Sequence, residues 1–323
     1  MERAALIERT GGPDVIGWHD VALPPPGPGE VRLRHGAVGL NFIDTYHRGG
    51  LYPLKLPSGL GLEAAGTVEA IGDGVEHWRP GMRAGSFGGP LGAYATARNI
   101  AADLLVAIPD AVDDRTAAAL LLKGATAAML VEQCAHVQPG DTVLVTAAAG
   151  GVGHLLVGWL KAVGATVIGT VGSDAKAARA RAAGADHVLA SGDDVAAQVR
   201  TLTGGTGVAA VLDGVGKATW AQALASTRRR GLIVSYGNAS GPVDGVNLGL
   251  LARHGSLFVT RPTLFDYAAT AAERQALADR IWAMLAAGAI VPEIGQTFTL
   301  EDAADAHRAI EAGTTQGSTV LVP

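Results

Sequence analysis

The chain has 323 residues, of which 48% are hydrophobic and 17% charged, a balance that favours a well-filled core and excludes a disordered chain. At about 150 residues per domain, this length predicts roughly two domains. The formal net charge of −5 does not indicate a nucleic-acid-binding protein, whose surface is basic. Cys134 is the single cysteine, so neither an intramolecular disulfide nor a zinc site with several cysteines can form.

The first residues carry charges at Glu2, Arg3 and Glu8 and lack the apolar stretch of a signal peptide. We therefore expect a cytoplasmic protein.

Residues 1–123 have the pattern of a β-rich domain. Short apolar runs such as "AALIE", "AAGTVEAIG" and "GAYATA" are separated by turns rich in proline and glycine. This spacing predicts a compact, barrel-like fold.

Residues 124–261 alternate between strand and helix patterns. The apolar run 142–146 predicts a strand, residues 152–164 a helix that ends near Gly164, and residues 166–170 a second strand. A further helix is expected after Ser173, its N-cap, with Gly184 past its end. Continued alternation predicts an open, doubly wound parallel sheet with helices on both faces.

The residues after Pro262 do not extend this alternation. A longer helix, the run "IGQTFTL", a short helix and a closing strand "STVLVP" follow instead. We expect them to return to the first domain, which gives domains of 1–123 plus 262–323 and of 124–261.

The stretch 143–160 contains no charged residue unless His154 is protonated. Its length would suit a membrane span, but three glycines within residues 147–153 oppose a continuous helix. The pattern A-x-G-x-x-G lies between a predicted strand and a predicted helix, as a dinucleotide site requires, with phosphates at the helix N-terminus. Ala148 stands in place of the usual first glycine, so a tight turn without a ligand remains the alternative.

The end of the second strand favours NADPH over NADH. No acid stands at the strand end to bind a ribose hydroxyl, and Gly172 and Ser173 occupy the loop. Ser173 could hydrogen-bond a 2′-phosphate at the helix N-terminus while Lys176 neutralises it. Asp174 argues against this, although an acid in the first helical turn also suits the helix dipole.

Several stretches together resemble a known family. They are "NFIDTYHRGGLYP", "LLKGATA", "AAAGGVG" with "GNASGPV", and the tail "TQGSTVLVP". The chain resembles the quinone oxidoreductases of the zeta-crystallin type, in the zinc-independent branch of the medium-chain dehydrogenases/reductases. The resemblance implies a GroES-like catalytic domain completed by the C-terminal tail, an inserted Rossmann domain, a homodimer and a substrate cleft between the domains.

The zinc-dependent relatives carry a cysteine in the segment where this chain has Asn41, and a histidine where Leu62 precedes Glu63. The resemblance therefore implies hydride transfer without a metal. Without a Lewis acid, the acceptors expected are those that take hydride readily, quinones or an enone at its β-carbon.

The resemblance also implies catalytic positions. Asn41, Tyr46 and Tyr52 match positions that line the substrate cleft, where amide and phenol groups could hydrogen-bond a quinone oxygen as it gains negative charge. Each has a structural alternative, with Asn41 as a turn residue and the tyrosines as core aromatics.

Cofactor contacts are implied by position as well. Lys123 and Thr126 are expected near the nicotinamide–phosphate end. The other matching positions are Gly150, Gly151 and Val152 at the pyrophosphate, and Tyr236, Asn238 and Ser240 beside the nicotinamide ribose. Ala128, Ala190 and Gly313 depart from the family, which often has an aromatic residue, a tyrosine and an arginine there.

These features predict NADPH-dependent reduction of quinones. A 2-alkenal, enone or enoyl-thioester reductase on the same scaffold is one alternative. A cofactor-binding structural protein with little turnover is another. No membrane or nucleic-acid partner is expected.

Overall fold

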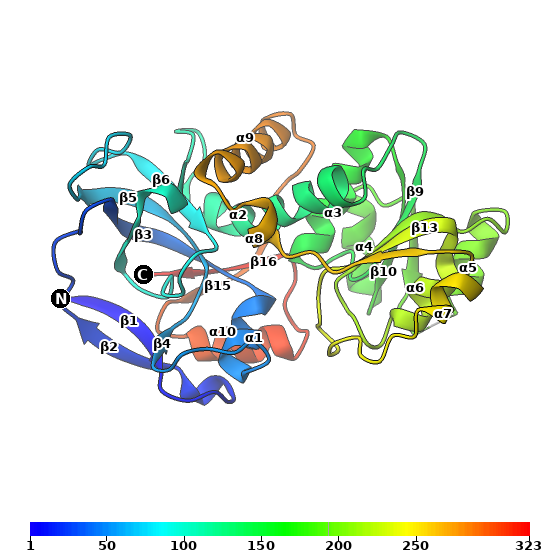
Figure 1. The fold of residues 1–323 in the computed structure, drawn as a ribbon, viewed down its shortest axis with the longest axis horizontal. Helices are drawn as coiled ribbons and strands as arrows, with labels where there is room; N and C mark the ends of the chain where they lie inside the picture. The colour runs from blue at the N-terminus through cyan, green and yellow to red at the C-terminus, as the bar shows by residue number, and fades with distance from the viewer. Residues whose placement is uncertain (193) are drawn as a thin grey trace. The chain divides into compact units, whose positions relative to one another are not determined.

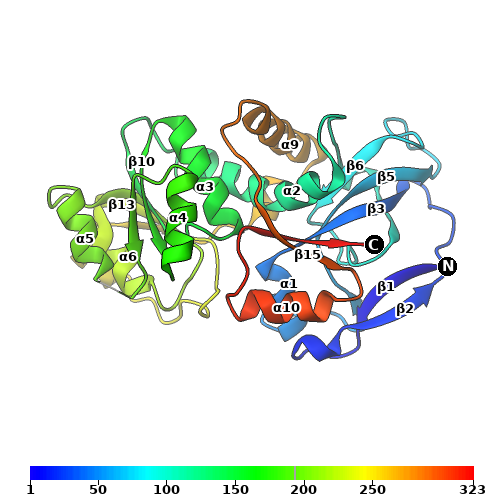
Figure 2. The ribbon, with the colours of Figure 1, turned by 180° about the vertical axis from the view of Figure 1, so that it is seen from behind.

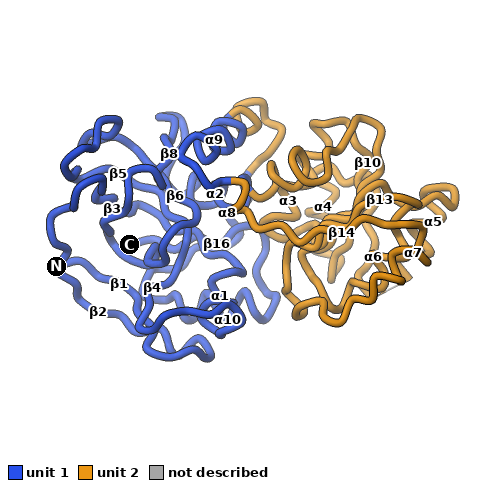
Figure 3. The backbone as a smooth tube through the Cα atoms, viewed as in Figure 1, with its two compact units in different colours: residues 1–125, 268–282, 292–323 blue, residues 126–267, 283–291 orange. Residues whose placement is uncertain are grey.

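The computed structural model describes residues 1–192 and 194–323, which form two compact units (Figures 1 and 3). The first unit comprises residues 1–125, 268–282 and 292–323, and the second comprises residues 126–267 and 283–291. The sequence placed residues 262–267 in the first domain, and it did the same with residues 283–291. Residues 283–291 group with the second unit because they pack on the helix after the glycine turn: a Cβ on Gly158 would lie 2.6 Å from the Ala289 carbonyl oxygen.

Two sheets make up the first unit. A three-stranded sheet has the order β2 (Gly17–Val21), β1 (Glu2–Ile7), β4 (Ser58–Gly59). The larger sheet has the order β15 (Ile294–Thr299), β16 (Ser318–Val322), β3 (Glu30–Leu40), β5 (Glu63–Ile71), β6 (Arg83–Phe87), β8 (Leu105–Ala107), and β7 (Ala97–Ala101) also pairs with β3. Strand β16 runs antiparallel to β3, with Thr319 opposite Leu40, so the end of the chain completes this sheet.

Strand β3 explains how this unit buries its core. Its side chains alternate, with Val31, Leu33 and His35 buried between more exposed neighbours, as the period of two in a half-buried strand requires. The carboxyl-terminal half of the strand is buried on both faces. Helix α10 (Ala303–Glu311) packs against this core and contacts α1 (Phe42–Gly49), beside which it lies in Figure 2.

A helix that crosses the expected domain boundary was not predicted. Helix α2 (Asp114–Ala128) continues as a π-helical segment, Met129–Cys134. The signal was present in the sequence, since Asp113 precedes an apolar run and accepts the Thr116 N–H at 2.9 Å. The remaining elements that flank the first unit's sheets are the 3₁₀ turns Pro13–Val15 and Ala102–Leu104 and helix α9 (Ala271–Ala286).

Residues Asp114–Cys134 are long and apolar enough to cross a membrane by length and composition alone. Of the most apolar window in this run, 78% is buried inside the protein, as in the core helix of a folded domain.

The second unit is a doubly wound parallel sheet, as predicted. Its order is β11 (His187–Ala190), β10 (Thr166–Val171), β9 (Thr142–Val145), β12 (Val208–Asp213), β13 (Thr227–Ser235), β14 (Phe258–Thr260). All five pairings are parallel, and the order reverses between β9 and β12, as in nucleotide-binding Rossmann sheets. The helices are α3 (Gly151–Val163), α4 (Asp174–Ala182), α5 (Val195–Leu202), α6 (Trp220–Ser226), α7 (Gly249–Arg253) and α8 (Leu264–Tyr267).

The helices of this unit pack in pairs, α3 with α4 and α5 with α6. Because the crossovers on either side of β9 run in opposite directions along the sheet, right-handed connections place the two pairs on opposite faces. The predicted ends are confirmed: α3 stops at Gly164, which has φ 88°, and Ser173 is the N-cap of α4. The uncharged stretch 143–160 is thus a strand, a turn and a helix, and no continuous span.

Candidate functional site

The glycine turn connects β9 to α3 at the switch in strand order. Gly150 is the N-cap of α3, and neither a side-chain cap nor an acidic residue occupies the first turn. A Cβ on Gly153 would lie 2.2 Å from the Ala147 carbonyl oxygen, so only glycine allows this close approach of helix and turn. The first-turn N–H groups, from Gly151 and Val152 onward, therefore form a cradle for an anion such as a pyrophosphate.

A second helix N-terminus lies at the end of β10. Ser173 Oγ accepts the Lys176 backbone N–H at 3.4 Å, so the Ser173 hydroxyl proton still points away from the helix cap. A Cβ on Gly172 would meet nothing within 4 Å, and both Gly172 and Ser173 are exposed. This arrangement fits a phosphate group bound by Ser173 and neutralised by Lys176.

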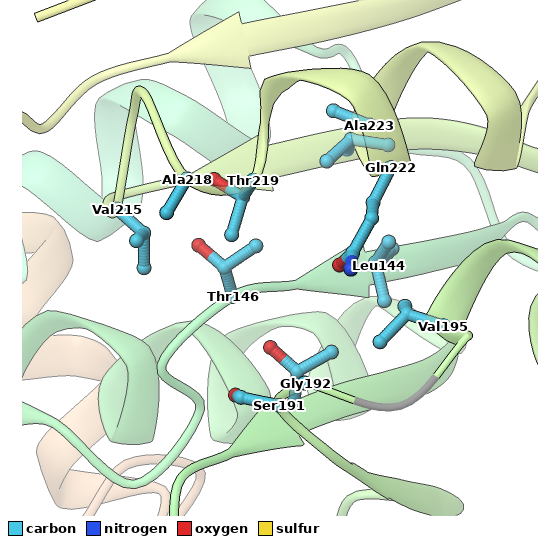
Figure 4. A pocket seen from close by; sticks show the side chains of 12 residues that line it. Leu144, Thr146, Ser191, Gly192, Val195, Val215, Ala218, Thr219, Gln222 and Ala223 are labelled. Carbon is cyan, nitrogen blue, oxygen red and sulfur yellow. The ribbon is translucent and has the colours of Figure 1, made fainter. Parts of the chain in front are cut away.

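A cavity of about 220 Å³ opens at the same edge of the sheet (Figure 4). Its walls combine apolar side chains with hydroxyl and amide groups, and its lining includes Thr146, Thr170, Ser191, Val215, Thr219 and Gln222. Such walls suit a flat heteroaromatic ring such as adenine. Sequence reasoning missed this cavity because its residues come from the ends of four strands.

The buried Asp213 at the end of β12 organises the cavity wall. Its carboxylate accepts hydrogen bonds from the hydroxyls of Thr146 and Thr219, each at 2.8 Å, and from the N–H groups of Val215 and Gly216 at 3.1 Å. The sequence stretch "LDGVG" contained this residue, but only the fold shows that Asp213 joins the end of β12 to the end of the neighbouring strand β9.

The loop after β13 packs on the loop after β12. Ser240 Oγ donates to the Val215 carbonyl and accepts the Ala218 N–H at 2.9 Å, which uses its hydroxyl within the protein. The amide of Asn238 donates to the Gly237 carbonyl at 3.0 Å and accepts from Arg261. Both residues therefore hold the loop, the structural role that the sequence left open for Asn238. A Cβ on Gly214 would lie 2.8 Å from the Tyr236 hydroxyl, so Tyr236 covers that loop.

A group that we call the Glu63 cluster, consisting of Asn41, Glu63 and Lys123, lies in the first unit. Glu63 is fully buried at the start of β5, and its Oε1 accepts the Leu122 N–H at 2.7 Å. Its Oε2 accepts Asn41 Nδ2 at 2.7 Å and faces Lys123 Nζ at 3.5 Å. The buried carboxylate thus joins β5, the start of α1 and the middle of α2. Thr126 lies one turn after Lys123 and is half-buried.

The structure changes the role expected of Asn41. Its Nδ2 donates to the Gly39 carbonyl at 3.3 Å as well as to Glu63, so both amide hydrogens are engaged. The opposite amide orientation would place the side-chain oxygen against these two acceptors. Asn41 therefore has no amide hydrogen left to donate to a quinone oxyanion.

Tyr46 and Tyr52 form one aromatic group, as their spacing suggested. Their ring centroids are 5.4 Å apart in an edge-to-face arrangement, and the ring centroids of His47 and Tyr52 are 5.7 Å apart. The Tyr52 N–H donates to the Tyr46 carbonyl, which holds the loop against α1. Both tyrosines are half-buried, as suits a platform for an aromatic ring.

A buried chain of hydrogen bonds, which sequence reasoning missed, supports α1 from below. Asp44 Oδ2 accepts the Asn41 N–H at 2.9 Å and the Tyr94 hydroxyl at 3.1 Å, and Tyr94 contacts His307 Nε2 at 2.9 Å. Because Arg48 can only donate, His307 Nδ1 accepts from it and Nε2 carries the proton. An acid three residues after Asn41 is the capping-box pattern and could have indicated Asp44.

Burial shifts the pKa values along this chain. Desolvation raises the pKa of Asp44 to about 7, opposed by the hydrogen bonds from Asn41 and Tyr94. Desolvation, followed by the charge of Arg48, lowers the pKa of His307 to about 3, so this histidine is neutral at physiological pH.

Among the described residues, no group of three or more His, Cys, Asp or Glu side chains is arranged to hold a metal ion. At the two positions that the resemblance singled out, Asn41 donates to Glu63 and Leu62 is buried.

We expect Gly153→Ala to weaken NADPH binding, because the new Cβ would displace the turn that binds the pyrophosphate. The expected loss is about ten- to a hundredfold, which corresponds to one hydrogen bond to a charged group. Overpacking should also cost about 1–3 kcal/mol of unfolding free energy. Fluorescence titration and thermal melting measure both. Gly172→Ala, whose Cβ meets no protein atom, is the stability control; equal effects of the two substitutions on melting would contradict this account.

His307 should make the protein acid-sensitive. Its folded-state pKa, about 3, lies below the unfolded value, so the stabilisation it allows is complete above about pH 6.5 and declines as the pH falls toward the folded value. We expect His307→Gln to reduce the slope of unfolding free energy against pH in this window by up to about 1.4 kcal/mol per pH unit. Urea unfolding across the window measures the slope, and the variant and wild type should run parallel above it. Identical slopes throughout would exclude a buried neutral histidine.

Comparison with known proteins gives a consistent result over the whole chain. Residues 27–110 match the family model for the alcohol dehydrogenase GroES-like domain, and residues 151–280 match that for zinc-binding dehydrogenases. The quinone oxidoreductase of Pseudomonas aeruginosa is 50% identical to this chain over 100% of both chains. The 2-haloacrylate reductase of a Burkholderia species is 43% identical to it, over 100% of this chain and 99% of the relative. The crystal structure of Escherichia coli quinone oxidoreductase complexed with NADPH has a TM-score of 0.97 at 42% identity, covering 99% of this chain and 100% of that one. The chain belongs to the zinc-independent quinone oxidoreductase family of the medium-chain dehydrogenases/reductases.

Proposed function

We propose that this protein is an NADPH-dependent quinone reductase that transfers hydride without a metal. The observation that carries the proposal is the pair of helix N-termini at the carboxyl edge of the parallel sheet. One is the uncapped start of α3 above Gly153, and the other is the start of α4 with Ser173 and Lys176. Membership of the quinone oxidoreductase family supports the choice of acceptor.

Different residues of the second unit would bind different parts of NADPH. The α3 N-terminus would hold the pyrophosphate, Ser173 and Lys176 the 2′-phosphate, and the cavity shaped by Asp213 the adenine. When bound, NADPH supplies the hydride. In the first unit, Tyr46 and Tyr52 would provide an aromatic surface for the quinone ring and exclude water from it.

The Burkholderia relative favours a second candidate function, the reduction of an activated carbon–carbon double bond. Both reactions place negative charge on an oxygen conjugated with the carbon that accepts hydride, so the same residues serve either. NADPH oxidation measured against a panel of quinones, enones and enoyl thioesters separates them. NADPH binding without turnover on any acceptor would instead support a cofactor-binding structural protein.

Lys176→Ala should raise the Kd for NADPH about ten- to a hundredfold and leave that for NADH unchanged, since a hydrogen bond to a charged group contributes about 1.5–3 kcal/mol. Parallel fluorescence titrations with the two cofactors measure the difference. Equal affinity of the wild type for NADH and NADPH would contradict the assigned 2′-phosphate site.

We also propose a homodimer formed through β14. This strand ends the six-stranded sheet, and its outer edge carries Phe258 and Val259, which are 60% and 38% exposed. An apolar strand edge favours pairing with the same edge of a second copy. The compartment we propose is the cytoplasm, where the single thiol of Cys134 stays reduced.

Phe258→Lys should shift the protein from dimer to monomer in sedimentation velocity, because a lysine on the edge strand opposes strand pairing. Val291→Lys, which charges an equally exposed apolar position of the same unit, is the matched control and should remain dimeric. A dimeric Phe258→Lys variant would place the interface elsewhere.

A further inference from the structure

We propose that Lys123 is the acid of the reaction: its ammonium group stabilises the oxyanion formed by hydride transfer and then donates the proton. This inference rests on the proposed reductase function and names a group that the sequence assigned to cofactor binding. The need for such a group follows from Asn41, whose amide hydrogens are both engaged by Gly39 and Glu63.

The position of Lys123 fits this role. Its Nζ and Asn41 Nδ2 contact the same oxygen, Glu63 Oε2, so the two side chains are neighbours at the start of α1. Helix α1 also carries Tyr46, half of the proposed platform for the quinone. The proposal places the oxygen of a ring on that platform within reach of the Lys123 ammonium group, which shares Glu63 Oε2 with Asn41 at the start of the same helix.

The hydrogen-bonding capacity of Lys123 also fits. The side chain is 6% exposed, and an ammonium group has three N–H donors. Throughout the described part of the chain, which omits only residue 193, Glu63 Oε2 at 3.5 Å is its one hydrogen-bonding or ion-pairing partner. A buried ammonium with donors to spare is unusual, because each unsatisfied donor costs free energy unless a ligand completes it.

Other charged groups near Lys123 are few. Glu63 is on β5, and Asp44 on α1 interacts electrostatically with both Lys123 and Glu63. Glu63 is not the acid, because both of its oxygens accept hydrogen bonds, from Leu122 and Asn41. Asp44 is not the acid either, because it is fully buried and cannot reach a substrate. Glu63 is thus a positioning residue that orients the Lys123 ammonium.

The quinone receives the hydride, that is, one hydrogen with two electrons, and one of its oxygens becomes an oxyanion. An N–H bond of Lys123 breaks, its electron pair stays on Nζ, and the proton forms an O–H bond on that oxygen. The ring carbon that took the hydride then loses a proton to water while the second oxygen gains one from water, which completes the hydroquinone. The neutral amine takes a proton from water after the product leaves. For an enone, the same proton goes to the enolate oxygen.

The test must separate catalysis from a structural ion pair. Lys123→Met alone leaves the Glu63 charge buried without its partner, which is strongly destabilising. The double variant Lys123→Met with Glu63→Gln removes both charges together. Because the new amide NH2 would face the Leu122 N–H or Asn41 Nδ2, we expect a folded protein with a lower melting temperature than the wild type. It should retain the wild-type KM for NADPH, while kcat falls by about 10²- to 10⁴-fold, the usual contribution of an acid catalyst. Lys55→Met, at an exposed position of the same unit, is the matched control and should keep the wild-type rate.

A binding measurement provides a readout that does not require turnover. 4-Nitrophenol resembles the hydroquinone product, and its anion absorbs visible light. At a pH where free 4-nitrophenol is about half ionised, the wild type and Lys55→Met should increase the anion band, because an ammonium group favours the phenolate. The double variant should not.

Recovery of wild-type kcat in a stable double variant would show that Lys123 serves only to balance Glu63, and an undiminished anion band in that variant would overturn the proposal in the same way. If the wild type reduces no quinone or enone, the proposed function fails by itself, and the anion band still decides whether Lys123 stabilises an oxyanion.

Discussion

The buried carboxylate of Glu63 is the constraint around which the first unit is arranged. A fully buried carboxylate is tolerated only when its oxygens are paired, and the partners of Glu63 come from two segments far apart in the sequence. It accepts from the backbone of α2 at Leu122, from Asn41 at the start of α1, and from Lys123. Satisfying this one charge therefore brings the start of α1 and the middle of α2 to the same end of β5. A Cβ on Gly39 would lie 2.2 Å from Glu63 Oε2, so the neighbouring strand must carry glycine for the arrangement to fit.

The second unit solves a similar problem with Asp213. This carboxylate is also fully buried at a strand end, and its donors among the described residues are uncharged hydroxyl and backbone groups. Its partners fix the loop that lines the cavity at the carboxyl edge of the sheet. Asp213 is fully satisfied by neutral donors and shapes a wall, whereas Glu63 retains a cation beside it and thereby places a charged donor near the aromatic platform.

The position of α1 depends on a buried chain of hydrogen bonds, from Asp44 through Tyr94 and His307 to Arg48. These groups are drawn from helices α1 and α10 and from the loop before β7, and His307 lies 259 positions after Arg48. The C-terminal helix α10 therefore takes part in holding the helix that carries Tyr46. This gives a physical reason for the return of the chain to its first unit: without α10, Arg48 and Tyr94 would lose a buried partner.

The sequence by itself determined the features that depend on neighbouring residues. Strand, glycine turn, helix and strand follow from apolar periodicity and from Gly153, and the caps of α3 and α4 at Gly164 and Ser173 were located correctly because a cap is a local hydrogen-bonding requirement. Helix α2 was missed because its apolar run was taken as part of a β-rich domain. Only the tertiary structure decided the direction of the Asn41 amide, the isolation of Lys123 beside Glu63, and the joining of His307 to Tyr94. Those depend on which segments pair across the sheets, and hydrogen bonds between groups 22 to 259 positions apart leave no local pattern in the sequence.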